Sequence, residues 1–215
     1  MNRRFWLYYE LYRPYYSYDI MGWLFAIIRG YFGGGYAGSA SNEIDGIQFS
    51  DESAINPSAK LSVARRVLAG VNSTIKGYFG GGYTTTSTKE IDGIQFSDES
   101  AINPSATLNI ARRELAGVNS TTRGYFGGGF TGSYSKEIDG IQFSDESAIN
   151  PSATLSAARL VLAGVNSTTK GYFGGGTMGS NKNEIDGIQF SNESAINPSA
   201  TLAVAEGFIA DSFEN

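Results

Sequence analysis

The sequence is organised around a glycine-rich hexapeptide, Gly30-Tyr31-Phe32-Gly33-Gly34-Gly35. The same six residues begin again at Gly77, Gly124 and Gly171, so the interval between copies is 47 residues each time. A fixed period of this length is typical of solenoids, propellers and other repeat arrays. The sequence therefore predicts one domain, 30–215, and a separate aromatic-rich N-terminal segment, 1–29. The domain consists of four units, namely 30–76, 77–123, 124–170 and 171–215.

Composition excludes several kinds of chemistry. The chain of 215 residues has a net charge of −5 and contains neither cysteine nor histidine. Disulfides, Ser-His-Asp or cysteine nucleophiles and the usual zinc sites are therefore excluded. The acidic balance argues against nucleic acid as a partner, because nucleic-acid binders present clustered basic residues. We interpret the basic pairs Arg65-Arg66 and Arg112-Arg113 as surface arginines or as members of buried ion pairs.

Residues 1–28 have no copy later in the chain, whereas Arg29 stands at the position of Lys76, Arg123 and Lys170 in the repeat. The apolar run of segment 1–29, Ile20 to Ile28, is nine residues long, whereas a membrane span needs roughly 20. We therefore expect no membrane span, and we interpret the segment as a strand or an adapter packed on the repeats. Without cysteine the compartment stays open: a virion, an extracellular surface and the cytoplasm all fit.

Each unit has the pattern of several short strands separated by turns. In the second copy we expect strands at 77–80, 90–96, 106–111 and 114–118. Between them we expect a polar loop at 83–89, a turn at 97–100 and a proline-containing break between strands at 102–105. Such close spacing of strands and turn residues is typical of an all-β sandwich, barrel or propeller. One alternative is an amphipathic helix over 106–118, where Leu108, Ala111, Leu115 and Val118 recur at helical spacing.

The order of certain residues within the unit resembles the kelch repeat. A glycine doublet (Gly81-Gly82) is followed by an aromatic residue (Phe96), a large apolar residue (Ile102) and an arginine (Arg112). The resemblance covers residues 30–215 and implies a kelch-like β-propeller of four blades, as a closed ring or as an open part of one. The sequence departs from the family in having isoleucine where the family has tryptophan. In addition, Glu206 replaces the arginine in the fourth copy.

The chain end bears on ring closure. Residues 208–211 align with 67–70, which form the first strand of a blade. They could therefore complete the first blade beside 30–35. Residues 21–28 compete for the same place. The expected states are therefore a monomeric ring or a homo-oligomer that completes a larger ring.

Paired carboxylates recur in every unit, at Glu43/Asp45, Glu90/Asp92, Glu137/Asp139 and Glu184/Asp186. Residues two apart in a strand point the same way, so these pairs could form a collar for Ca²⁺ or serve a hydrolase. They could equally be solvated, or hydrogen-bonded to neighbouring backbone. No loop has the ligand series of a calcium site, and no Gly-Lys-Ser/Thr follows the glycines. We expect no catalytic residue, cofactor or metal site.

The stretch after the glycines differs in every copy, at 36–42, 83–89, 130–136 and 177–183. Variable loops on a constant scaffold are how repeat proteins present binding surfaces, although exposed loops also tolerate change. The predicted partner-binding residues are Tyr36, Ser39, Tyr83, Thr86, Phe130, Tyr134, Met178 and Asn181. The preferred function is a non-catalytic binding or structural module for a protein or glycan, in the setting of a viral tail or surface protein. The alternative is a carboxylate-dependent hydrolase or a calcium-binding, lectin-like propeller.

Overall fold

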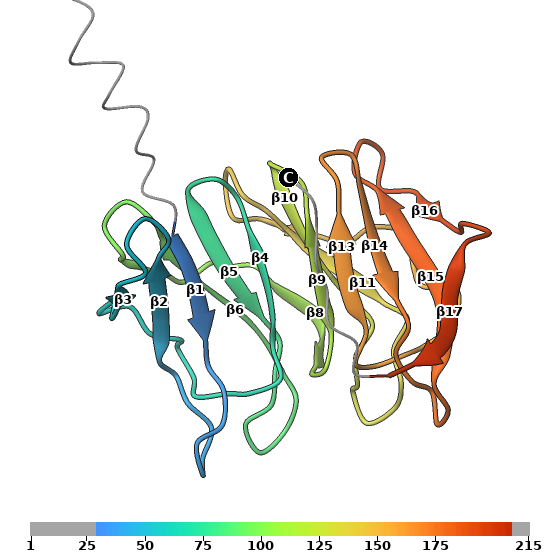
Figure 1. Cartoon of the computed structure of the whole chain (residues 1–215), viewed down its shortest axis with the longest axis horizontal. Coiled ribbons are helices and arrows are strands. Elements are labelled where there is room, and N and C mark those ends of the chain that lie inside the picture. Colours follow the sequence, from blue (N-terminus) through green and yellow to red (C-terminus); the bar gives the residue numbers. More distant parts are fainter. Residues whose placement is uncertain (1–28, 208–215) are drawn as a thin grey trace, which may run out of the picture.

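A computed structural model of the protein describes residues 29–207 as an all-β structure (Figure 1). Seventeen strands and no helix lie within these residues, and the strands form four antiparallel sheets. The prediction of an all-β fold is confirmed. The N-terminal segment up to residue 28 and the tail from residue 208 lie outside the described residues. No helix between residues 29 and 207 has the length and apolar character to cross a membrane.

The four sheets share three strands of the 47-residue unit and differ in the strands added to them. The first sheet contains β1 (Arg29–Gly33), β2 (Ile44–Gln48) and β3 (Ala54–Ile55). The second contains β4 (Ala69–Asn72), β5 (Lys76–Gly80), β6 (Thr88–Gln95) and β7 (Ala101–Ile102), with β8 (Thr107–Arg112) also paired to β6. The third contains β9 (Ala116–Asn119), β10 (Arg123–Gly127), β11 (Ile138–Gln142) and β12 (Ala148–Ile149). The fourth contains β13 (Ala163–Asn166), β14 (Lys170–Gly174), β15 (Lys182–Gln189) and β16 (Ala195–Ile196), with β17 (Thr201–Glu206) paired to β15.

The helix alternative over 106–118 is wrong. That stretch contains β8 and most of β9, and the chain bends between them at Glu114, whose φ is 58°. A helix cannot pass through this left-handed conformation. Two boundaries also differ from the sequence prediction. Strand β6 begins at Thr88, inside the predicted polar loop. Ile102 lies in β7 rather than in the predicted break between strands.

Neighbouring sheets pack an aromatic ring of one against a glycine of the other. Phe126 in β10 is fully buried, and its ring carbons approach to 2.7 Å of the position that a Cβ on Gly80 of β5 would occupy. Any larger residue at position 80 would displace the ring, so the close packing of the sheets requires glycine there. The same contact joins Phe79 to Gly33 and Phe173 to Gly127. One packing unit is thus used three times.

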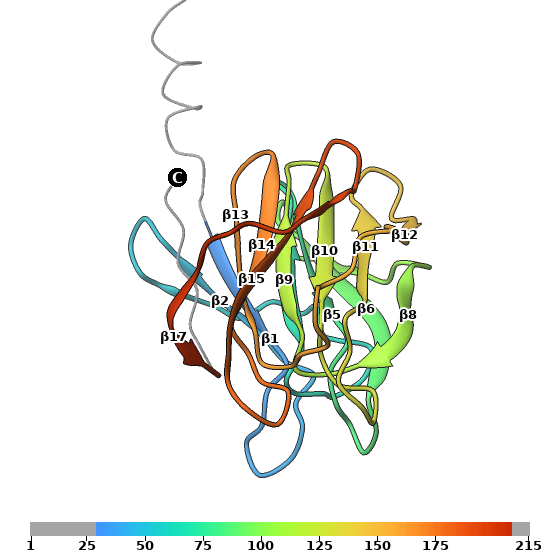
Figure 2. The same cartoon turned by 90° about the vertical axis from the view of Figure 1, so that its right-hand side faces the viewer.

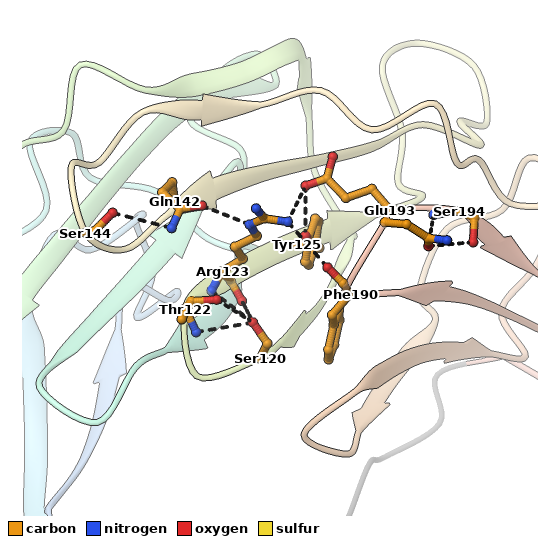
Figure 3. A network of polar contacts seen from close by, with 10 residues as sticks. Ser120, Thr122, Arg123, Tyr125, Gln142, Ser144, Phe190, Glu193 and Ser194 are labelled. Carbon is orange, nitrogen blue, oxygen red and sulfur yellow. Dashed lines mark hydrogen bonds and ion pairs between the residues drawn. The ribbon is translucent and has the colours of Figure 1, made fainter.

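A carboxylate on each later sheet bridges back to the sheet before it. Glu193 accepts hydrogen bonds from Arg123 and from the hydroxyl of Tyr125, both at 3.1 Å (Figure 3). The Tyr125 ring also stacks on Phe190, with ring centroids 5.5 Å apart. Equivalent contacts join Glu146 to Lys76 and Tyr78, and Glu99 to Arg29 and Tyr31. These contacts fix the order in which the sheets follow one another.

The first strands of the later sheets, β4, β9 and β13, lie next to one another. A Cβ on Gly117 would lie 2.2 Å from the backbone oxygen of Gly70, so these edges meet at glycine. Beside them, the Glu114 N–H donates to the Val67 oxygen and the Val161 N–H donates to the Glu114 oxygen, both at 2.9 Å. The sheets therefore converge along their β4, β9 and β13 edges. The first and fourth sheets stand at opposite ends of the long axis (Figures 1 and 2).

Candidate binding surface

The four variable loops, 36–42, 83–89, 130–136 and 177–183, lie along one edge of the array, the lower edge in Figure 1. We call this surface the loop edge. Each loop is closed by the same type of backbone bond: Ala37 to Ser39, Thr84 to Thr86, Thr131 to Ser133 and Met178 to Ser180, at 3.0–3.1 Å. The backbone is therefore constant while the side chains change from copy to copy.

The structure brings the eight predicted partner-binding residues to this one edge. Tyr36, Ser39, Thr86, Tyr134, Met178 and Asn181 are exposed, whereas Tyr83 and Phe130 are half-buried. The loop edge thus presents aromatic, aliphatic and polar side chains side by side. Its two half-buried rings have a different role, because arginine side chains cover them.

Arginine side chains join the aromatic rings of successive loops into a ladder. The guanidinium of Arg66 lies 4.5 Å from the ring centroid of Tyr36 and 5.4 Å from that of Tyr83. Arg113 lies 4.6 Å from both Tyr83 and Phe130. These distances are within the range of cation–π attraction. The row Tyr36–Arg66–Tyr83–Arg113–Phe130, which we call the arginine–aromatic ladder, thus runs across three sheets.

The ladder ends at Phe130, in the third unit. Leu160 stands where the earlier units have Arg66 and Arg113, and it pairs with Thr177 through the backbone as those arginines pair with Tyr83 and Phe130. Sequence reasoning did not foresee the ladder. Its only signal was that the second arginine of each basic pair lies 17 residues before an aromatic residue that follows a glycine doublet.

The first arginine of each basic pair, and Arg159 at the same position in the third unit, are buried. Arg65, Arg112 and Arg159 are fully buried and bond to Asp92, Asp139 and Asp186 at 2.5, 2.6 and 2.7 Å. The interpretation as buried ion pairs is confirmed for Arg65 and Arg112. Burial raises the pKa of Asp139, against the opposing effect of Arg112, and lowers the pKa of Arg112 itself.

These ion pairs also show where the recurring aspartates lie. Asp92, Asp139 and Asp186 are each bonded to an arginine from the segment that precedes their sheet, and they do not form an acidic collar. Within residues 29–207 there is no group of three or more acidic side chains placed to hold a metal ion. In the described structure these carboxylates act in packing between sheets.

Two grooves lie at the other end of the strands, one between the turns that precede β10 and β14 and one between the turns that precede β5 and β10. One, of about 310 Å³, is lined by Ser120 to Arg123, Thr168, Thr169 and Gln189 to Ser191. A second, of about 210 Å³, lies one sheet earlier, between Ser73 to Ile75 and Gln142 to Ser144. Both are lined by hydroxyl groups and by one phenylalanine ring. A third, of about 200 Å³, runs along the convergent edges beside Gly70, Gly117 and Gly164.

No protein-family model matches the sequence, and no curated protein matches it. The resemblance to the kelch repeat therefore stays a prediction.

Proposed function

We propose that the protein is a non-catalytic binding module built as a kelch-like β-propeller of four blades, or as an open part of one, and that the loop edge contacts a protein or glycan partner. Four successive sheets with three strands in common, of which the later three converge along β4, β9 and β13, fit this architecture. The observation that carries the functional proposal is the combination of a constant loop backbone with different exposed side chains in every copy.

The chemistry of the loop edge fits such a partner. Tyrosine, methionine and arginine are enriched at protein interfaces, and tyrosine provides a large contact area at a low cost in side-chain entropy. Tyr36, Tyr134 and Met178 are exposed on this edge. The arginine–aromatic ladder restrains Tyr36 and Arg66 before a partner arrives, which lowers the entropy lost on binding. We favour the setting of a viral tail or surface protein.

The test is binding of the full chain to a glycan array and, in parallel, to a panel of surface proteins. We expect wild-type protein to bind a defined subset, and Tyr36→Ala and Tyr134→Ala to lose at least about tenfold in affinity. Ile75→Ala is the matched control, because Ile75 is an exposed apolar residue at the other end of the strands.

Two outcomes would overturn the proposal. One is the absence of binding to every glycan and protein offered, and the other is equal loss of affinity in the control variant. Repeating the array with calcium and with a chelator decides between this module and the calcium-dependent, lectin-like alternative.

A further inference from the structure

The two ends of the array present the two halves of the contact that joins the sheets internally. On the first sheet, Phe32 is 70% exposed, whereas its counterparts Phe79, Phe126 and Phe173 are 8%, 0% and 0% exposed. Phe49 is 56% exposed, whereas Phe96 is half-buried and Phe143 and Phe190 are 6% exposed. Ile47 and Asp45 are also more exposed than their counterparts, which are all buried. We call Phe32, Asp45, Ile47, Phe49 and Glu52 the head face.

The fourth sheet carries the complementary half. Ala200 is exposed and Leu202 is half-buried, whereas the alanines and leucines at these positions in the other three units are all buried. Val165 is exposed and Ile185 is half-buried, although Val71, Val118, Ile91 and Ile138 are buried. We call Val165, Lys170, Tyr172, Ile185, Ala200 and Leu202 the tail face. Figure 2 looks towards this end of the molecule.

We propose that the head face of one copy of the chain binds the tail face of a second copy, in the register of the internal contacts. The contact between the second and third sheets serves as the model for this junction. In that contact Lys76 pairs with Glu146, so at the junction the equivalent Lys170 would pair with Glu52 of the second copy. The same register also places Tyr172 on Phe49, as Tyr78 stacks on Phe143. Leu202 and Ala200 would cover Phe32 and Ile47, as Leu108 and Ala106 share a core with Phe126 and Ile141.

A second copy is the occupant because the two faces of one copy lie at opposite ends of its long axis (Figure 1). The lysine and the glutamate that would meet are complementary in charge, and the apolar residues match in kind. Such a head-to-tail contact is heterologous: it closes into a ring when the rotation between copies allows, and otherwise continues as a chain. The proposal does not depend on the loop edge.

One position weakens this junction relative to its internal copies. Glu206 stands where Arg65, Arg112 and Arg159 form buried ion pairs, and its partner across the junction would be Asp45. Two carboxylates would therefore meet where the internal contacts have an arginine and an aspartate. We expect the association to be reversible and dependent on concentration.

The experiment is sedimentation velocity on the full chain over a range of protein concentrations. We expect wild-type protein to associate, and Phe32→Asp to raise the dissociation constant at least about tenfold. Ile75→Asp is the control: its exposed side chain lies outside both faces, so the dissociation constant should not change. Glu206→Arg should lower the dissociation constant about tenfold, because it supplies the missing ion pair.

Exchanging the charges of Lys170 and Glu52 gives a second test that does not depend on Phe32→Asp. Lys170→Glu and Glu52→Lys should each weaken association, and the chain that carries both substitutions should recover it, because each junction then again joins opposite charges. The proposal is overturned if wild-type and Glu206→Arg proteins both stay monomeric up to about 100 μM. It is also overturned if Phe32→Asp associates like wild type, or if the doubly substituted chain remains as weak as the single variants.

Discussion

Val67 and Val161 hold a backbone conformation that valine rarely adopts. Both have a φ of 52°, and the residue between them in the series, Glu114, has a φ of 58°. Branching at Cβ makes this left-handed region costly. The backbone bonds from Glu114 to Val67 and from Val161 to Glu114 give the reason that the conformation persists, because they tie successive sheets together.

Replacing Val67 by asparagine should therefore stabilise the protein. Asparagine tolerates the left-handed region, so we expect the free energy of unfolding to rise by about 1 kcal/mol. Val63→Asn is the matched control, since Val63 is 42% exposed against 44% for Val67 but has no positive φ. Urea unfolding of the two variants measures the difference. Equal effects at the two positions would contradict the account of strain.

Removing Arg112 alone from its buried pair with Asp139 should lower the unfolding free energy more than replacing both residues by apolar ones. Arg112→Met leaves the Asp139 carboxylate buried without its partner at 2.6 Å, so we expect a loss of about 3–5 kcal/mol in unfolding free energy. The double variant Arg112→Met/Asp139→Leu should lose less than the single variant, because no buried charge remains. Chemical denaturation of both variants tests this order, and a double variant less stable than Arg112→Met would contradict it.

Tyr125 should make the fold sensitive to alkali. Burial is the main reason that the pKa of Tyr125 rises to about 12, and the neighbouring Glu193 carboxylate adds to the rise. A tyrosine in the unfolded chain ionises near pH 10. The unfolded state therefore releases this proton first, and the stability contributed by Tyr125 is lost as the pH rises from about 10 to about 12.

The measurement is the unfolding free energy of wild type and Tyr125→Phe across this alkaline range. Wild type should lose stability more steeply than Tyr125→Phe, which has no hydroxyl to ionise. Phenolate absorbance of the native protein should show Tyr125 ionising late. Identical slopes for the two proteins would show that Tyr125 ionises as it does in the unfolded chain.

At the scale of elements, the arginine–aromatic ladder links loops that are far apart in sequence. Tyr83 lies between Arg66 and Arg113, so its ring takes part in two of the four cation–π contacts. We expect Tyr83→Ala to lower the unfolding free energy by about 1–2 kcal/mol. Thr86→Ala, in the same loop but exposed, should change it by less than about 0.5 kcal/mol. A thermal denaturation series distinguishes the two, and equal small effects would mean that the ladder is not stabilising.

The elements could be predicted from sequence because their signals are local. Glycine and turn residues bracket short apolar segments in every copy, so most of the strands and all four loops follow from the period. The helix alternative failed because helical spacing at 106–118 carries no information about Glu114, whose N–H donates to the oxygen of Val67, just before the first strand of the neighbouring sheet. The arginine pairs were understood only in part for the same reason. Arg65 meets an aspartate 27 residues away, and Arg66 meets rings in two different loops.

At the scale of the whole molecule, the same set of contacts is repeated between neighbouring sheets. Repeat proteins are stabilised by each unit and by its contacts with adjacent units, and the end units differ from the inner ones. Here the head face and tail face are exposed because each has only one neighbouring sheet in the described structure. The same geometry places the four variable loops on one edge, where they can act together.

Amide hydrogen exchange at Glu114 and Val161 tests most directly whether the sheets pack in this order. Neither amide lies in a strand, and each is bonded to a backbone oxygen one sheet away. The account predicts that both amides exchange slowly, at rates close to those of the amides within β9 and β10. Rapid exchange at Glu114 and Val161, alongside slow exchange within the strands, would show intact sheets without the proposed packing and would contradict it.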